Sequence, residues 1–102
     1  DQNYLVFSGI GNHKTFVEML KNNKLKIVSD LEYPDHYQYS KRDFDEIIIN
    51  AKKFNAHIIT TEKDYLRLEN FNRNEILYVK SSLEISDEKS LTNKLLKLNE
   101  KN

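Results

Sequence analysis

Short apolar runs recur along the chain, and stretches with a helical spacing of apolar residues lie between them. The first run, over 4–10, ends in a turn with two glycines, which suits a strand buried on both faces. The second run, over 25–31, contains the β-branched residues that strands favour. We therefore predict strands over 4–10, 25–31, 56–60 and 75–79, the last with a continuation over 83–85.

Two capping patterns mark helix starts between these runs. Ser40 is followed three residues later by Asp43, so that each side chain can accept a hydrogen bond from the other residue's amide. Thr61 and Asp64 repeat this arrangement. With the apolar stripes, these patterns predict helices near 16–20, over 40–54, through 65–68 and over 86–101.

The alternation of strands and helices sets the fold class. Strand–helix–strand units at this spacing build a parallel sheet whose faces are covered by helices. A chain of 102 residues is long enough for one domain. We predict an α/β fold, a three-layer Rossmann-like domain with a mostly parallel sheet of about four strands flanked by helices. The strand order stays open, although right-handed crossovers restrict it.

The charge composition excludes several classes of partner and site. Sixteen basic residues balance 16 acidic ones with the signs interspersed, so the sequence offers no basic stripe for binding nucleic acid. The lack of cysteine excludes disulfides and thiolate metal sites. No apolar run is long enough to cross a bilayer. Because the chain starts without Met and enters a strand at once, we expect a C-terminal domain whose partner domain is not included.

Three polar segments follow the first three predicted strands, over 9–13, 34–39 and 60–64. In an open parallel sheet, ligands bind beyond the carboxyl ends of the strands. We therefore expect all three segments to lie together at one rim of the domain, and this rim is the candidate site.

The first polar segment is a glycine turn, with Gly9, Gly11 and Asn12 before a helix. Free amides and the helix dipole at such a place can bind a phosphate. The segment has neither a full dinucleotide fingerprint nor the Gly-Lys-Ser/Thr ending of a P-loop. A tight turn in which glycine adopts a positive φ explains it equally, and both interpretations stay open.

The second polar segment contains a candidate general base, His36. A carboxylate would fix the tautomer of its ring, but the adjacent Asp35 is poorly placed for that, so the carboxylate would come from elsewhere. In the alternative interpretation, 34–39 is a surface loop whose tyrosines pack over the edge of the sheet.

The third polar segment joins a strand to a short helix. Thr60 and Thr61 can donate hydrogen bonds to a phosphate, and Lys63 can neutralise its charge. In the alternative, Thr61 caps the helix while Glu62 and Asp64 complement its dipole.

Two further histidines are weaker candidates. We expect His13, at a helix start, to be solvated. His57 lies in an apolar strand and is expected to be a core or edge residue rather than a ligand. The sequence has no group of residues with the spacing of a metal site.

The three polar segments together resemble the tetraacyldisaccharide 4′-kinase family, specifically its C-terminal domain. The resemblance covers roughly residues 4–80 and is specific because three segments match in order and register. The chain departs from the family at His13, where Pro is usual, and at Tyr37, where a second His is common. The matching stretches are Gly-Ile-Gly-Asn at 9–12, Tyr-Pro-Asp-His at 33–36 and Thr-Thr-Glu-Lys-Asp at 60–64, followed by Arg67 and Leu68.

The resemblance implies a kinase that uses ATP and Mg²⁺ to phosphorylate the 4′ position of the lipid A disaccharide precursor, giving lipid IVA. The reaction would take place at the cytoplasmic face of the bacterial inner membrane. Residues 1–102 would be the C-terminal lid of a two-domain protein, and the N-terminal P-loop domain, which is absent here, would bind ATP and Mg²⁺. The fragment alone is expected to be soluble and inactive.

The resemblance also implies roles for individual residues. His36 matches the family's catalytic base, which pairs with an aspartate of the N-terminal domain. The alternative to the kinase is a non-catalytic Rossmann-like interaction module or a nucleotide-binding regulatory domain. The other matched positions, expected in the substrate cleft or supporting it, are Gly9, Gly11, Asn12, Asp35, Tyr39, Thr60, Thr61, Lys63 and Asp64.

Overall fold

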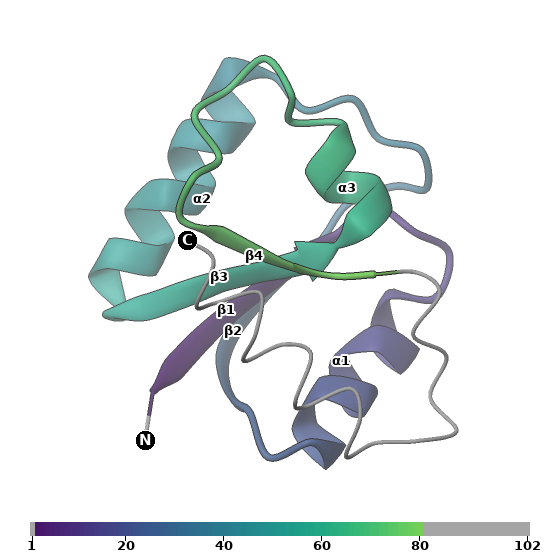
Figure 1. Cartoon of the computed structure of the whole chain (residues 1–102), viewed down its shortest axis with the longest axis vertical. Helices are drawn as coiled ribbons and strands as arrows, with labels where there is room; N and C mark the ends of the chain where they lie inside the picture. The colour runs from purple at the N-terminus through teal and green to yellow at the C-terminus, as the bar shows by residue number, and fades with distance from the viewer. Residues whose placement is uncertain (1, 81–102) are drawn as a thin grey trace.

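The computed structural model describes residues 2–80, which form a four-stranded sheet with helices on both faces (Figure 1). Its elements, in chain order, are β1 (Asn3–Ser8), α1 (His13–Asn22), β2 (Lys26–Glu32), α2 (Lys41–Lys53), β3 (Ala56–Thr61), α3 (Glu62–Leu66) and β4 (Ile76–Val79). The strands are ordered β2-β1-β3-β4, and every pair in the sheet is parallel. The α/β, Rossmann-like prediction is confirmed.

Each strand and helix predicted within 2–80 is present, with ends shifted by a few residues. The strand expected over 4–10 stops at Ser8, because the chain turns there into the glycine segment. The predicted strand continuation over 83–85 and helix over 86–101 lie outside the described residues. Among the described helices, none combines the length and the apolar character that crossing a membrane requires.

The hydrophobic core forms two layers, one on each side of the sheet. On one face, Phe16 of α1 packs with Val6 of β1. On the other face, Ile47 of α2 packs with Leu5 of β1. Leu5 and Val6 are both fully buried, since successive side chains of a strand point to opposite faces. This confirms that the first strand is buried on both sides and that the domain has three layers.

The strand order creates a crevice between β1 and β3. After β1 the chain turns into α1 on one side of the sheet, whereas after β3 it turns into α3 on the side that α2 also covers (Figure 1). Neighbouring strands whose connections diverge in this way leave space beyond their carboxyl ends, and open α/β sheets bind their ligands there.

Thr60 fixes the two strand ends that border this crevice. The β1–β3 ladder ends with the pair Val6 and Ile59. Beyond it, the hydroxyl of Thr60 donates to the Phe7 carbonyl at 2.6 Å and is fully buried. Thr60 was a candidate for binding phosphate, but its hydroxyl is used inside the fold, so its role in the structure is supporting.

The predicted reciprocal capping pattern is complete at Ser40, whereas at Thr61 the observed capping bond is the one to its hydroxyl. The Asp43 amide donates to the Ser40 hydroxyl at 3.1 Å, and the Ser40 amide donates to the Asp43 carboxylate at 2.9 Å. This amide, together with the hydroxyls of Tyr37 and Ser40, holds the pKa of Asp43 below its ordinary value. At α3, the Asp64 amide donates to the Thr61 hydroxyl. Since Tyr37 also donates to Asp43 at 2.9 Å, the start of α2 anchors the end of the preceding loop.

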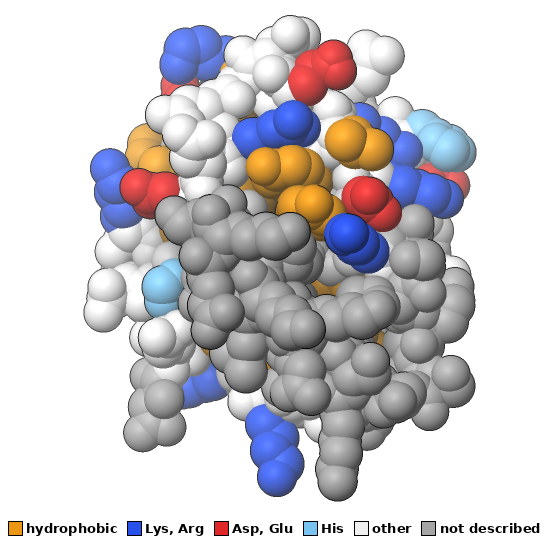
Figure 2. Space-filling model, in the orientation of Figure 1, with side chains coloured by type: hydrophobic (Ala, Val, Ile, Leu, Met, Phe, Trp, Pro, Cys, Tyr) orange, Lys and Arg blue, Asp and Glu red, His pale blue; other side chains and the backbone are white. Residues whose placement is uncertain are grey.

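Basic and acidic side chains are mixed on the surface. On the face shown in Figure 2, Lys and Arg side chains alternate with Asp and Glu around a few exposed hydrophobic ones. This distribution agrees with the net charge of zero.

Candidate functional site

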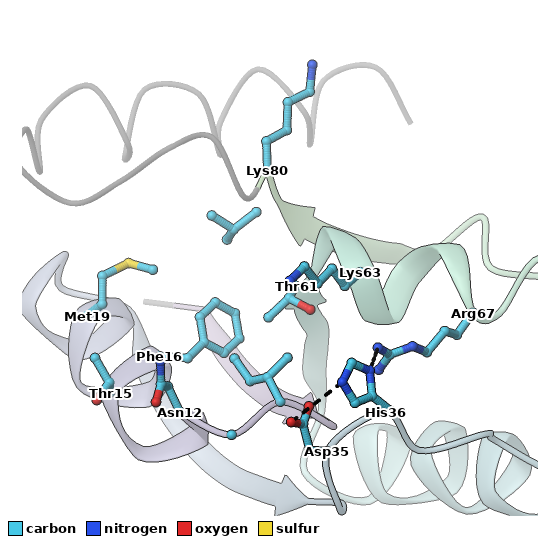
Figure 3. A pocket seen from close by; sticks show the side chains of 13 residues that line it. Asn12, Thr15, Phe16, Met19, Asp35, His36, Thr61, Lys63, Arg67 and Lys80 are labelled. Carbon is cyan, nitrogen blue, oxygen red and sulfur yellow. Dashed lines mark hydrogen bonds and ion pairs between the residues drawn. The ribbon is translucent and has the colours of Figure 1, made fainter.

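The three polar segments meet at the carboxyl end of the sheet, around an open cleft of about 550 Å³ (Figure 3). The expectation that they share one rim is therefore met. Apolar residues of the turn after β1, of α1 and of β4 form part of the lining, and polar and basic side chains complete it. The residues that line the cleft are Ile10, Gly11, Asn12, Thr15, Phe16, Met19, Asp35, His36, Thr61, Lys63, Arg67, Val79 and Lys80.

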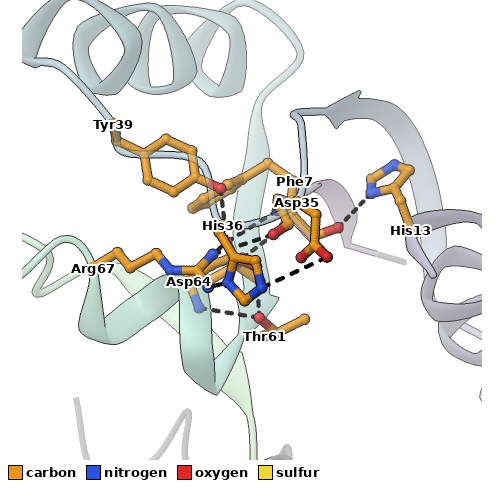
Figure 4. A network of polar contacts seen from close by, with 11 residues as sticks. Phe7, His13, Asp35, His36, Tyr39, Thr61, Asp64 and Arg67 are labelled. Atoms are coloured by element: carbon orange, nitrogen blue, oxygen red, sulfur yellow. Dashed lines mark hydrogen bonds and ion pairs between the residues drawn. The ribbon is translucent and has the colours of Figure 1, made fainter. Parts of the chain in front are cut away.

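A buried carboxylate, Asp64, joins the three segments behind this cleft (Figure 4). It is fully buried and accepts hydrogen bonds from the Gly9 amide at 3.0 Å and from the Tyr39 hydroxyl at 2.9 Å. The Thr61 hydroxyl donates to its second oxygen at 2.6 Å, and Arg67 donates to the first at 3.1 Å. We call these five residues the Asp64 cluster. Its four donors come from three parts of the chain, namely the turn after β1, the loop before α2 and the two ends of α3, so the carboxylate fixes their mutual positions.

Glycine is needed at Gly9 because the backbone is crowded, not because of its φ angle. Neither glycine has a positive φ, so the prediction of a positive-φ glycine turn is wrong. A Cβ atom at Gly9 would lie 2.9 Å from the Pro34 carbonyl oxygen and 3.3 Å from Asp64. At Gly11 the nearest atom would be 3.8 Å away, which is ordinary contact. The close approach of the two loops therefore depends on Gly9 alone.

We expect Gly9→Ala to destabilise the chain by about 1–3 kcal/mol, because the Pro34 carbonyl must move to admit the new methyl group. Gly11→Ala is the matched control, and it should raise stability by up to about 1 kcal/mol by restricting the unfolded chain. Urea unfolding of both variants measures the two changes. Equal effects at the two positions would contradict this explanation.

His36 stands at the rim of the cleft on a constrained loop. Its φ of 60° lies in the left-handed region, and its amide donates to the Gly9 carbonyl at 3.0 Å. The side chain is 79% exposed. Its Nε2 is 3.7 Å from an oxygen of Asp35, and its Nδ1 is 3.3 Å from Nη2 of Arg67 (Figure 3). A strained backbone that presents an exposed imidazole is typical of a functional position.

Arg67 is the functional candidate that sequence reasoning missed. It was noted only as part of a resemblance, yet its guanidinium contacts Asp64, the Gly9 carbonyl and His36. The available signal was its position three residues after Asp64, a spacing at which helical side chains meet.

His13 is buried, contrary to the expectation that it is solvated. Its Nδ1 lies 2.6 Å from the Ser8 hydroxyl and its Nε2 lies 3.0 Å from the Asp30 carboxylate. Both Ser8 and His13 are nearly inaccessible to solvent. The three side chains therefore tie the start of α1 to β1 and β2, and they lie outside the lining of the cleft.

The remaining sequence candidates are placed as follows. Asn12, Gly11, Thr61 and Lys63 line the cleft, and Asn12 and Lys63 are exposed to solvent. His57 is exposed at the start of β3, at the other end of the sheet, with its ring centroid 5.6 Å from that of Tyr4. The expectation that His57 is a core or edge residue is therefore wrong, because its side chain is exposed and β3 is an inner strand of the described sheet.

Tyr33 and the two tyrosines of the second polar segment, Tyr37 and Tyr39, pack against one another and against the core. The rings of Tyr33, Tyr37 and Tyr39 lie about 5 Å apart, and Tyr39 also meets Phe7 edge to face. Burial raises the pKa of Tyr39 far above its ordinary value, and the nearby charge of Asp64 raises it further. Tyr39 thus remains a donor to Asp64 at any physiological pH.

We expect the chain to lose stability between pH 10 and 12. Burial raises the pKa of Tyr33 from 10.0 to about 12 in the folded state, with smaller contributions from Asp43 and Glu46. Because the pKa of Tyr33 is higher in the folded chain than in the unfolded chain, the neutral phenol stabilises the fold. This stabilisation is complete below the unfolded-state pKa and is lost as the pH rises through the folded-state pKa. Circular dichroism and tyrosinate absorbance, recorded together, test this. Tyr33→Phe should move the alkaline transition to higher pH, and no movement would contradict the assignment.

The described part of the site supplies an imidazole, basic side chains and a buried carboxylate, but no metal-ligand cluster. Among residues 2–80, no three acidic or histidine side chains are grouped to hold a metal ion. The Gly9 amide is already bonded to Asp64, so it is not free to bind a phosphate. The arrangement suits proton transfer by His36 and neutralisation of an anion by Lys63.

Comparison with known proteins gives one consistent result. The model of the tetraacyldisaccharide-1-P 4′-kinase family matches residues 1–100. The chain is 93% identical over 102 residues to the tetraacyldisaccharide 4′-kinase of Pelagibacter ubique and 40% identical over 96 residues to that of Rickettsia typhi. The two matches include 100% and 94% of this chain, but only 32% and 30% of the length of the two relatives. The chain thus spans about a third of the curated relatives, and no solved structure matches it significantly.

Proposed function

Because the chain belongs to the tetraacyldisaccharide-1-P 4′-kinase family, we propose that it is the C-terminal domain of a kinase acting on the lipid A disaccharide precursor. The complete protein transfers the γ-phosphate of ATP to the 4′-hydroxyl of tetraacyldisaccharide 1-phosphate, giving lipid IVA. In this proposal it works at the cytoplasmic face of the bacterial inner membrane, where its lipid substrate is available.

The observation that carries this proposal is the family match over residues 1–100. The position of His36 supports it, because an exposed imidazole at the rim of a cleft can reach a substrate bound outside the domain. The rest of the machinery, a P-loop and the ligands of Mg²⁺, belongs in the proposal to an N-terminal domain that faces this cleft. ATP and Mg²⁺ supply the phosphoryl group and the neutralisation of its charge.

In the proposed reaction, His36 acts as the general base. The oxygen of the 4′-hydroxyl attacks the γ-phosphorus, the bond from that phosphorus to the β–γ bridging oxygen breaks, and ADP leaves. The hydroxyl proton passes to the imidazole, and an aspartate of the N-terminal domain orients the ring and stabilises its charged form. Lys63, at the same cleft, favours the approach of the anionic substrate.

The test is ATP-dependent phosphorylation of tetraacyldisaccharide 1-phosphate by the complete protein, with the 102-residue chain assayed beside it. We expect the complete protein to form lipid IVA and the chain alone to form none, because phosphoryl transfer needs the P-loop and the metal site. No product from the complete protein would overturn the proposal and favour an interaction or regulatory module. Product from the chain alone would overturn the division of roles between the two domains.

A further inference from the structure

Arg67 is the residue that connects His36 to the buried part of the site. Its side chain is about three-quarters buried, and Nη1 donates both to Asp64 at 3.1 Å and to the Gly9 carbonyl at 3.2 Å. The same Gly9 carbonyl accepts the backbone amide of His36. The bonds of Nη1 therefore fix the position of the guanidinium, while its Nη2 points at the exposed imidazole of His36 (Figure 4).

The contact between Arg67 and His36 determines where the ring proton lies. A guanidinium carries only donors, so Nδ1 of His36, at 3.3 Å from Nη2, must be the acceptor. In the neutral ring the proton is then on Nε2, which faces the Asp35 carboxylate at 3.7 Å. The lone pair of Nδ1 remains available to a donor that takes the place of Nη2.

We infer that Arg67 is a positioning residue that sets the tautomer and orientation of His36; this inference rests on the proposed function. The Nε2–H group of His36 donates to an orienting carboxylate, and Nδ1 is the nitrogen that receives the proton of the substrate hydroxyl. The hydroxyl, itself a donor, replaces Arg67 at Nδ1 when the substrate binds. Without Arg67 both tautomers are populated and the left-handed loop loses a support, so fewer molecules have the base correctly aligned.

The experiment compares three variants of the complete kinase. Arg67→Met removes the donor and should lower kcat at least about tenfold while changing KM for ATP by no more than about twofold. Arg67→Lys keeps a charge and a donor and should retain more activity than Arg67→Met. Arg73→Met is the matched control, because Arg73 donates to the Tyr65 carbonyl at 2.7 Å and covers the Tyr65 ring, away from His36. It should lower thermal stability and leave kcat within about twofold.

A second measurement separates positioning from a general loss of structure. Nuclear magnetic resonance of the complete kinase with ¹⁵N-labelled histidine reports which ring nitrogen carries the proton, and His36→Asn identifies the signal. We expect Nε2–H in the unmodified protein and a mixture of tautomers in Arg67→Met. An unchanged tautomer in Arg67→Met, or a kcat within about twofold of the unmodified enzyme, would overturn the inference. If the unmodified protein has no kinase activity, the proposed function fails. The comparison of the His36 tautomer in the unmodified protein and in Arg67→Met still tests whether Arg67 sets it.

Discussion

Replacing His36 by Asn in the complete kinase is expected to lower kcat by about 10²-fold or more, the usual loss for a general base. Asparagine is the informative substitution because it tolerates the left-handed φ of 60° that His36 adopts. It removes the proposed base with little disturbance of the loop, whereas alanine would add backbone strain to the loss of the ring. The measurement is steady-state phosphorylation of tetraacyldisaccharide 1-phosphate at saturating ATP.

His57→Ala is the matched control for this experiment. His57 is also exposed, but it lies at the amino end of β3, at the opposite end of the sheet from the cleft. Its replacement should leave kcat within about twofold of the unmodified enzyme. A loss below about fivefold in His36→Asn would remove the catalytic role of His36 and leave the family assignment untouched.

The largest expected effect on stability follows the removal of a buried carboxylate. We expect Asp64→Ala to destabilise the chain by about 3–5 kcal/mol, because Arg67 loses its ionic partner and the donors at Gly9 and Tyr39 lose their acceptor. Urea unfolding followed by circular dichroism measures the change. Asp64→Asn retains the shape and one acceptor oxygen, so it should fall between Asp64→Ala and the unmodified chain.

An exposed aspartate provides the comparison. Asp45 is half exposed and pairs with Lys41 across one turn of α2 at 3.2 Å. Such surface pairs contribute roughly 0.3–0.5 kcal/mol, so Asp45→Ala should change stability by no more than that. Equal losses from Asp64→Ala and Asp45→Ala would show that the Asp64 cluster does not support the fold as described.

The elements of the fold could be predicted because their signals are local. The start of α2 is encoded by Ser40 and Asp43, three residues apart, and the observed bonds between them are those the pattern implies. The apolar runs mark the strands, since a strand buried on both faces needs apolar side chains at successive positions, as at Leu5 and Val6. The meeting of the three polar segments at one rim follows from the parallel sheet alone.

The interior of the site could not be predicted because it depends on partners distant in sequence. Asp64 was expected to cap or complement a helix, and the bond from its amide to the Thr61 hydroxyl fits that expectation. Its bonds to Gly9 and Tyr39 require the folded arrangement of two other loops. The same limitation explains the error at Gly9, where the constraint is the neighbouring Pro34 carbonyl and not a local φ angle.

The error at His13 has a similar origin. Helix starts are usually solvated, and the sequence alone did not indicate that this one is enclosed. The side chain is buried because Ser8 lies beneath it and Asp30, from the neighbouring strand β2, closes the other side. Each ring nitrogen then has a partner, which allows a polar ring to be buried at little cost.

The bonds behind the cleft also set the order in which the chain can fold. Those from Thr60 to Phe7, from Gly9 to Asp64 and from Arg67 to Gly9 join residues separated by 53, 55 and 58 positions. Closing such long loops costs entropy that must be offset before any of these bonds is formed. We expect α2, whose cap is local, to form early and the cleft to form late, after β3 has docked beside β1. We therefore expect that a ribosome must release the chain beyond Arg67 before the cleft can form.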